Sequence, residues 1–288
     1  MRSLRMRTWI DRGLTLAAAA CGLLACAILL GIAGSILWRG AAVLDWGFLT
    51  REATEAGASG GVLYEILGTA ILIGTALAVS LPLAVGLALL QSVYLVRPRS
   101  RRWMLAGLYA ANGVPSILLG VAGLVVFTRL LGWGKSWLAG GLLLGLMILP
   151  TLTVALIERL HGLPRKYVEA AAGLGLSRSQ IIWSVLLPQS AGGLLSGSLL
   201  GLARAAGETA PILFAAAVFS GAGLPSGIRD SPVVALPYHI FVLAQDSFDP
   251  AVQSHLWGAA FVLLALVFGL SLLALPARLR VHEEARRA

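Results

Sequence analysis

Long apolar stretches separated by short polar segments dominate the chain. Several are as long as the roughly 20 residues that an α-helix needs to cross the hydrocarbon core of a bilayer. They predict membrane-spanning helices at about 14–38, 66–94, 104–131, 137–157, 192–219 and 256–276. The expected fold is therefore an all-α integral membrane protein with six transmembrane helices.

Composition supports this interpretation and removes one alternative. Of the 288 residues, 58% are hydrophobic and only 12% are charged, about half the charged share of a soluble domain. The first apolar stretch follows several arginines, as in a cleavable signal peptide. Its apolar run from Leu14 to Trp38 exceeds the roughly 7–15 residues of a signal peptide, so we expect an uncleaved span. Cys21 and Cys26 both fall in it, which excludes a disulfide framework.

The net charge of +9 would suggest nucleic acid as a partner of a soluble protein. Here the basic residues sort by segment instead. Four lie in each segment that faces inward if the N-terminus is cytoplasmic: Arg2, Arg5, Arg7, Arg12; Arg97, Arg99, Arg101, Arg102; Arg159, Arg165, Lys166, Arg178; Arg278, Arg280, Arg286, Arg287. This pattern follows the positive-inside rule. It predicts a multi-pass bacterial inner-membrane protein with both termini in the cytoplasm.

The chain divides into an N-terminal part, a membrane core and a C-terminal tail. Residues 1–61 hold the tail, the first span and an outer loop; residues 62–276 hold the core, with an inside loop at 158–191; residues 277–288 form a basic tail. The outer stretch LPYHIFVLAQDS at 236–247 could lie on the membrane surface as an amphipathic helix. No segment outside the membrane is long enough for a soluble nucleotide-hydrolysing domain.

The inside loop predicts two short helices joined by a glycine turn. Pro164 suits the first position of a helix, and Gly173 or Gly175 can end it in a left-handed conformation. Ser177 and Gln180 form a capping box for a second helix that ends before Pro188. A DNA-binding helix-turn-helix has a similar pattern but needs a basic recognition helix. A re-entrant loop without a partner is the other alternative.

The fifth span combines small residues with two charges. Small side chains recur every four residues, which predicts a narrow face for close helix packing: Gly193, Gly197, Gly201, Ala205. Arg204 and Glu208 are also four apart, within ion-pair reach, and Pro211 favours a bend beyond them. Ions inside a membrane are costly. The pair is therefore either a structural lock or part of a translocation path in which Arg204 meets an anion.

Several kinds of site are not expected. GWGKS at 132–136 resembles the end of a phosphate-binding P-loop, but Arg129 occupies the position of the required first glycine. The histidines fall in separate loops or tails, where a lone histidine is usually solvated, so no metal site is expected: His161, His239, His255, His282. No acid–base pair or nucleophile constellation suggests an enzyme.

The inside loop carries a recognisable signature. The pattern E-A-A-x(3)-G-x(9)-aliphatic-x-L-P, with Val185 as the aliphatic residue, lies on Glu169, Ala170, Ala171, Gly175, Leu187 and Pro188. It resembles the coupling motif of ABC importer permeases with the MetI-like, type I fold. The resemblance implies that these residues form a coupling helix seated on a separate ATPase chain. ATP and Mg²⁺ would be used by that partner, and this chain would bind no cofactor.

Further stretches narrow the resemblance. ARAAGETAP at 203–211, NGVPSILLGVAGLVVF at 112–127 and LPYHIFVLA at 236–244 are similar to permeases of phosphate ABC importers, and the last favours the PstA type over its PstC-type partner. The resemblance implies a substrate pathway with Arg204, Glu208 and Thr209, and more weakly Ser116. The hydroxyls of Thr209 and Ser116 could instead bond their own backbone.

The same resemblance implies four kinds of partner. They are a second permease, two ATPase subunits, a periplasmic phosphate-binding protein and membrane lipid. Three alternatives stay open: an importer of molybdate, sulfate or phosphonate; a proton-coupled secondary carrier that uses Glu208; and a membrane enzyme or assembly scaffold.

Overall fold

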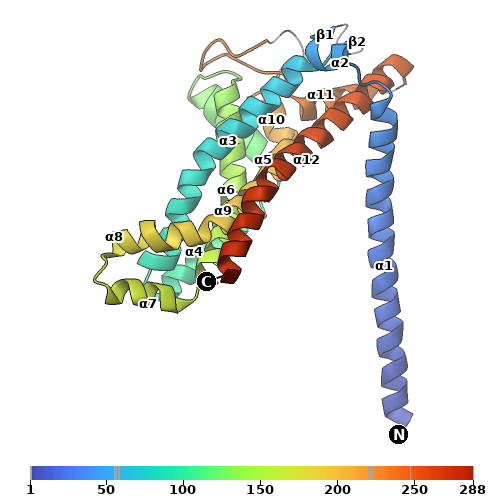
Figure 1. The fold of residues 1–288 in the computed structure, drawn as a ribbon. Coiled ribbons are helices and arrows are strands. Elements are labelled where there is room, and N and C mark those ends of the chain that lie inside the picture. The colour runs from blue at the N-terminus through green and yellow to red at the C-terminus, as the bar shows by residue number, and fades with distance from the viewer. Residues whose placement is uncertain are drawn as a thin grey trace.

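The chain folds into a helical bundle with one helix standing apart (Figure 1). The computed structural model describes residues 2–54, 57, 59–219, 221, 223–246 and 248–287, with backbone alone for 2–11, 246, 273–274 and 276–287. The separate helix is α1 (Arg2–Ala41), which meets the bundle only near its C-terminal end. There Gly40 lies against Phe261 and Trp257 of α12, and Arg39 stacks over the Trp257 ring at 5.0 Å.

Short elements cap the end of the bundle where α1 joins it. They are α2 (Trp46–Thr50), the hairpin β1 (Ala53–Thr54) and β2 (Ser59–Gly60), and α11 (Leu236–Leu243). The helix expected at 236–247 is thus confirmed as far as Leu243, followed by a 3₁₀ turn to Asp246; Ser247 lies outside the described residues. Leu236 and His239 are buried, so α11 packs onto the bundle and does not present a polar face.

The core of the bundle lies between α3 (Leu63–Leu89), which continues into a π-helical turn at Leu90–Tyr94, and α6 (Trp137–His161). Buried apolar side chains fill this contact: Leu72, Ala76, Leu144, Ile148, Leu152. Small residues let the helices approach closely, because a Cβ on Gly141 would lie 2.5 Å from Thr75 Cγ2. The predicted spans at 66–94 and 137–157 correspond to these two helices.

The third predicted span is wrong as a single helix. Residues 98–130 form α4 (Pro98–Asn112) and then α5 (Ser116–Gly123) with a π-helical turn at Leu124–Leu130. The two halves meet at 87°. Pro115 disfavours helical geometry at the residue before it, and Gly113 precedes that residue, so the chain turns there.

The inside loop and the fifth span also differ from prediction. α7 (Arg165–Gly173) ends as expected, and Gly175 takes the left-handed φ of +78°. The capping box of Ser177 and Gln180 is confirmed and begins α8 (Arg178–Ile181). That helix does not end before Pro188. It passes through a π-helical turn at Ile182–Leu186 into α9 (Leu187–Gly207), and Pro188 follows shortly after that turn.

The fifth span ends earlier than predicted. α9 stops at Gly207, and α10 (Ala210–Ala215) follows after a two-residue break. The ring of Pro211 would clash with the carbonyl of Gly207, four residues earlier, if the helix were continuous. The predicted bend is thus displaced from beyond Glu208 to Glu208 itself.

The last helix, α12 (Pro250–Arg287), includes the predicted sixth span and the backbone of the basic tail. Both termini lie at the end of the molecule that also carries α7 and α8, opposite the β-hairpin (Figure 1). Among the described residues, five helices are long and apolar enough to cross a membrane, and six if α4 and α5 count as one bent span.

Candidate functional site

Arg204 lies in the last turn of α9, where three helices meet. Its Nη1 donates hydrogen bonds to Asn112 Oδ1 and, at 3.4 Å, to Thr151 Oγ1. Thr151 Oγ1 also donates to Asn112 Oδ1 at 3.1 Å. Asn112 ends α4 and Thr151 follows Pro150 in the middle of α6. A guanidinium is thus fixed at the break of α4–α5, beside the break of α9–α10.

The predicted pair of Arg204 and Glu208 is present, but its geometry differs. Glu208 is the residue after α9 and has an extended backbone (φ −80°, ψ 132°), so the pair is not on one continuous helix. Arg204 Nε lies 3.9 Å from Glu208 Oε1, and the two side chains keep 30% and 17% of their exposure. This separation is at the limit for an ion pair. Contacts to Asn112 and Thr151 hold the guanidinium more closely.

Thr209 and Ser116 lie at the two helix breaks. Thr209 is the N-cap of α10, and its carbonyl accepts from Leu213 N at 2.9 Å. Ser116 begins α5. In the described part of the chain neither hydroxyl has a hydrogen-bond partner, so neither is bonded to its own backbone. Both remain available to a ligand or to water.

Sequence reasoning missed Asn112 and Thr151. Asn112 stands in the stretch NGVP, a turn signal within an apolar segment, and Thr151 follows a proline in a span. Single polar residues beside a helix-breaking proline in a membrane span are the signal that would have found both. Together they place Arg204 and leave its Nη2 with no protein partner among the described residues.

The coupling residues form a projecting pair of helices at the end away from the hairpin (Figure 1). Glu169 and Ala170 are exposed on α7, as expected for a surface that receives another protein. Ala171 is instead 5% exposed and packs inward against Leu160 and Ile181. The alanines of the motif therefore differ, since Ala171 packs on the chain's own core and Ala170 is exposed.

The remaining residues of the motif, Gly175 and the pair Leu187 and Pro188, lie at the turn after α7 and at the start of α9. Gly175 has no atom within 4 Å of a would-be Cβ, so only its left-handed backbone calls for glycine. Leu187 and Pro188 begin α9. α8, the π-helical turn and α9 form one run of helical turns from Arg178 to Gly207, with Arg204 in its last turn.

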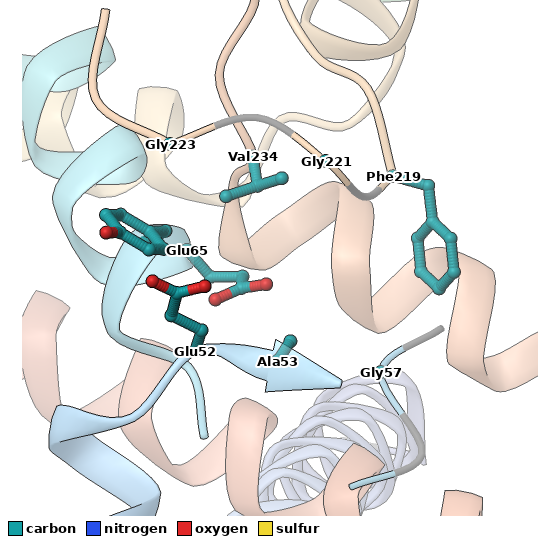
Figure 2. A pocket seen from close by; sticks show the side chains of 9 residues that line it. Glu52, Ala53, Gly57, Glu65, Phe219, Gly221, Gly223 and Val234 are labelled. Atoms are coloured by element: carbon teal, nitrogen blue, oxygen red, sulfur yellow. The ribbon is translucent and has the colours of Figure 1, made fainter. Parts of the chain in front are cut away.

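A polar recess lies at the opposite, hairpin end of the molecule. Its cavity of about 220 Å³ is lined by nine residues: Glu52, Ala53, Gly57, Tyr64, Glu65, Phe219, Gly221, Gly223 and Val234. Figure 2 shows the carboxyl groups of Glu52 and Glu65 beside each other in its lining. Two acids without a basic neighbour in the lining repel an anion. This recess is a poor anion site, in contrast to the surroundings of Arg204.

Behind Glu65 lies His239, for which the sequence prediction was wrong. A loop histidine was expected to be solvated, but its side chain is 2% exposed, with Nδ1 3.6 Å from Glu65 Oε1. Phe219 stacks on its ring at 5.6 Å. Burial first, and then the charge of His255, lower the pKa of His239 to about 4. At neutral pH the imidazole is therefore uncharged, and the contact is not an ion pair.

Comparison with known proteins identifies the family. Residues 80–281 match the family described as "Binding-protein-dependent transport system inner membrane component". The chain belongs to this family. Among relatives of the permease, the "Phosphate transport system permease protein PstA 2" of Mycobacterium bovis is 31% identical over 81% of this chain and 78% of its own length. The "Probable phosphate transport system permease protein PstA" of Methanocaldococcus jannaschii is 36% identical over 53% of each chain.

Solved structures agree on the fold of the permease. A chain of the inward-facing MetNI methionine ABC transporter superposes with a TM-score of 0.59 at 18% identity, covering 77% of this chain and 94% of that one. The MetI-like permease fold expected from the coupling motif is confirmed. The family match spans α3 from Ser80 onward to α12 and leaves out α1, the helix that stands apart from the bundle.

Proposed function

We propose that this permease forms half of the membrane pathway of an ATP-driven phosphate importer. Two lines of support converge. Relatives that cover most of the chain carry the name of phosphate transport permeases. Independently, the bundle holds an arginine at the point where two spans are broken. The arginine is the observation that carries the proposal, because a guanidinium offers paired donors that match an oxyanion.

Arg204 would bind the anion weakly and only in passing. Asn112 and Thr151 occupy Nη1, so Nη2 and Nε are the donors left for an oxyanion. Glu208, 3.9 Å from Nε, competes for the same donors and must be displaced as the anion arrives. This competition limits affinity, which a transport path needs in order to release its cargo. Thr209 and Ser116 add free hydroxyls at the same two breaks.

Coupling to ATP would act through α7 and α8. We propose that the exposed face of α7 around Glu169 seats on a separate ATPase subunit, which holds ATP and Mg²⁺. The basic residues of the termini and of this loop support a cytoplasmic position for that face. Two ATPase subunits, a second permease of the PstC type and a periplasmic phosphate-binding protein would complete the importer. Closure of the ATPases would switch the cavity around Arg204 between outside-open and inside-open states.

ATP-dependent phosphate uptake into vesicles that carry the whole complex tests this proposal. Arg204→Gln should abolish uptake while the complex assembles normally, and Arg204→Lys should retain only part of it because lysine lacks the paired donors. Arg99→Gln, on exposed α4, is the matched control. Undiminished uptake by Arg204→Gln would make the arginine structural. Wild-type vesicles that take up molybdate, sulfate or phosphonate in place of phosphate would change the cargo.

A further inference from the structure

A large cavity lies between α7 and the bundle at the end that carries the coupling helices, beside the place where Ala171 packs inward. Its volume is about 820 Å³. Most of its lining is aliphatic and comes from α6, α7, α8 and the turns between them: Leu160, Leu163, Val168, Leu176, Ile181, Leu186. None of these side chains needs a polar partner. An elongated apolar group is therefore the occupant that the floor of the cavity suits.

The rim of the cavity is basic. Arg101, His161, Arg165 and Arg178 line it, and no aspartate or glutamate does. Arg101 is held in place, because it donates to Leu95 O at 2.5 Å and to Ser92 O at 3.1 Å. Arg165 and Arg178 are exposed and have no hydrogen bond or ion pair within the described chain. The guanidinium groups of Arg165 and Arg178 are thus available to an anionic ligand beside the aliphatic lining of the cavity.

The depth of the cavity matches the lipid headgroups. It is bordered by Ser92 and Val93, in the turn that ends the α3 span, and by His161, at the end of α6. Membrane spans end where the hydrocarbon core gives way to the headgroup layer. Basic pockets between spans at the cytoplasmic surface suit anionic headgroups. The basic charge, the aliphatic lining and the depth of the cavity all favour an anionic lipid as its ligand.

We propose that this cavity binds one anionic glycerophospholipid, such as phosphatidylglycerol. Its phosphate lies between Arg165 and Arg178, and an acyl chain packs along the aliphatic floor. Inorganic phosphate would use the same arginines but leave the floor empty. The bound lipid touches α7 on one side and α6 and α8 on the other, so it braces the coupling helix against the bundle. This site lies outside the proposed anion path at Arg204.

Lipid retention by the purified full-length permease with its co-purifying partners tests the proposal. The protein is reconstituted in bilayers of phosphatidylcholine with a tenth of phosphatidylglycerol, extracted into detergent and examined by native mass spectrometry. One phosphatidylglycerol should remain bound per permease. Removing two charges by Arg165→Gln with Arg178→Gln should weaken retention about 30-fold. Arg97→Gln with Arg99→Gln, basic residues outside the cavity, should leave it unchanged.

Two further experiments, a substitution in the aliphatic lining and competition by inorganic phosphate, distinguish a lipid from other occupants of the cavity. Leu163→Asn, in the turn between α6 and α7, places an amide in the aliphatic lining and should also reduce retention. Millimolar inorganic phosphate should displace nothing. Equal retention by the double variant and its control would overturn the proposal, as would displacement by inorganic phosphate. The proposal would also be overturned if the double variant lost the ATPase partner but kept its lipid, because the two arginines would then bind a protein segment. Lipid retention is measured without any transport assay, so its result holds even if the importer carries a cargo other than phosphate.

Discussion

The glycines of α9 that face α6 differ in how crowded they are, and alanine substitutions can measure this difference. A Cβ on Gly193 would lie 2.4 Å from Arg159 Cβ, which real contacts do not reach. A Cβ on Gly201 would lie 3.5 Å from Ile148 Cβ, an ordinary contact. Gly107 of α4 has open space around it, so Gly107→Ala measures the effect of alanine on helix stability without any change in packing.

The expected changes in the free energy of unfolding follow from two opposing effects. Alanine in place of glycine stabilises a helix interior by about 0.5–1 kcal/mol. Overpacking costs about 1–3 kcal/mol. Gly201→Ala should therefore gain what Gly107→Ala gains, whereas Gly193→Ala should lose roughly 0.5–2 kcal/mol. Gly197→Ala, with its Cβ 3.0 Å from Ala155 Cβ, should fall between them.

Thermal unfolding of the full-length chain in detergent, at one fixed heating rate, ranks the variants. The order of midpoints should be Gly201→Ala above wild type and Gly193→Ala below it. A Gly193→Ala variant as stable as Gly201→Ala would refute the close approach of α9 to α6, and with it the placement of Arg204 against Thr151. A loss at both positions, with a gain at Gly107, would mean that the two helices approach more closely than described.

Three more predictions address the other features. Burial lowers the pKa of His239 from 6.5 to about 4. As the pH falls from 6.5 to 4, this histidine is protonated in the unfolded chain but not in the folded chain. The free energy of unfolding should therefore decrease by about 3 kcal/mol over this range. Acid unfolding of His239→Gln should show a flatter pH dependence, unlike that of exposed His161→Gln. Replacing Glu169 and Gly175 together should abolish ATPase recovery in a pull-down, and normal recovery would contradict the coupling assignment. Thr151→Val removes one acceptor of Arg204 and should raise the KM of uptake about fivefold at unchanged ATPase binding; an unaltered KM would separate Thr151 from the anion path.

Features governed by neighbouring residues could be predicted from the sequence. The capping box of Ser177 and Gln180 depends on residues three apart. The left-handed turn at Gly175 depends on glycine alone. The spans follow from the thickness of a bilayer, which sets one length for every helix that crosses it. The small-residue face of α9 is a repeat of four, and it packs on α6 as that repeat implies.

Features governed by distant contacts could not be predicted. The 87° bend at Gly113–Pro115 is different, because it has a local signal in Pro115 that hydropathy averaged over a window does not register. Asn112 and Thr151 are far apart in sequence and become partners of Arg204 only because α4, α6 and α9 converge. His239 is buried because α11 folds back over α3, which no local pattern of the outer loop indicates.

Two π-helical turns in the described chain end helices, at Leu90–Tyr94 and Leu124–Leu130, whereas a third, at Ile182–Leu186, lies between α8 and α9. This third turn adds one residue to a helical turn, so side chains beyond it point about 100° away from where a regular helical wheel would put them. A cysteine-accessibility scan along Arg178–Gly207 should therefore show two periodic series that are out of phase at Ile182–Leu186. A single helical wheel drawn through Arg178 and Arg204 would assign one of the two to the wrong face.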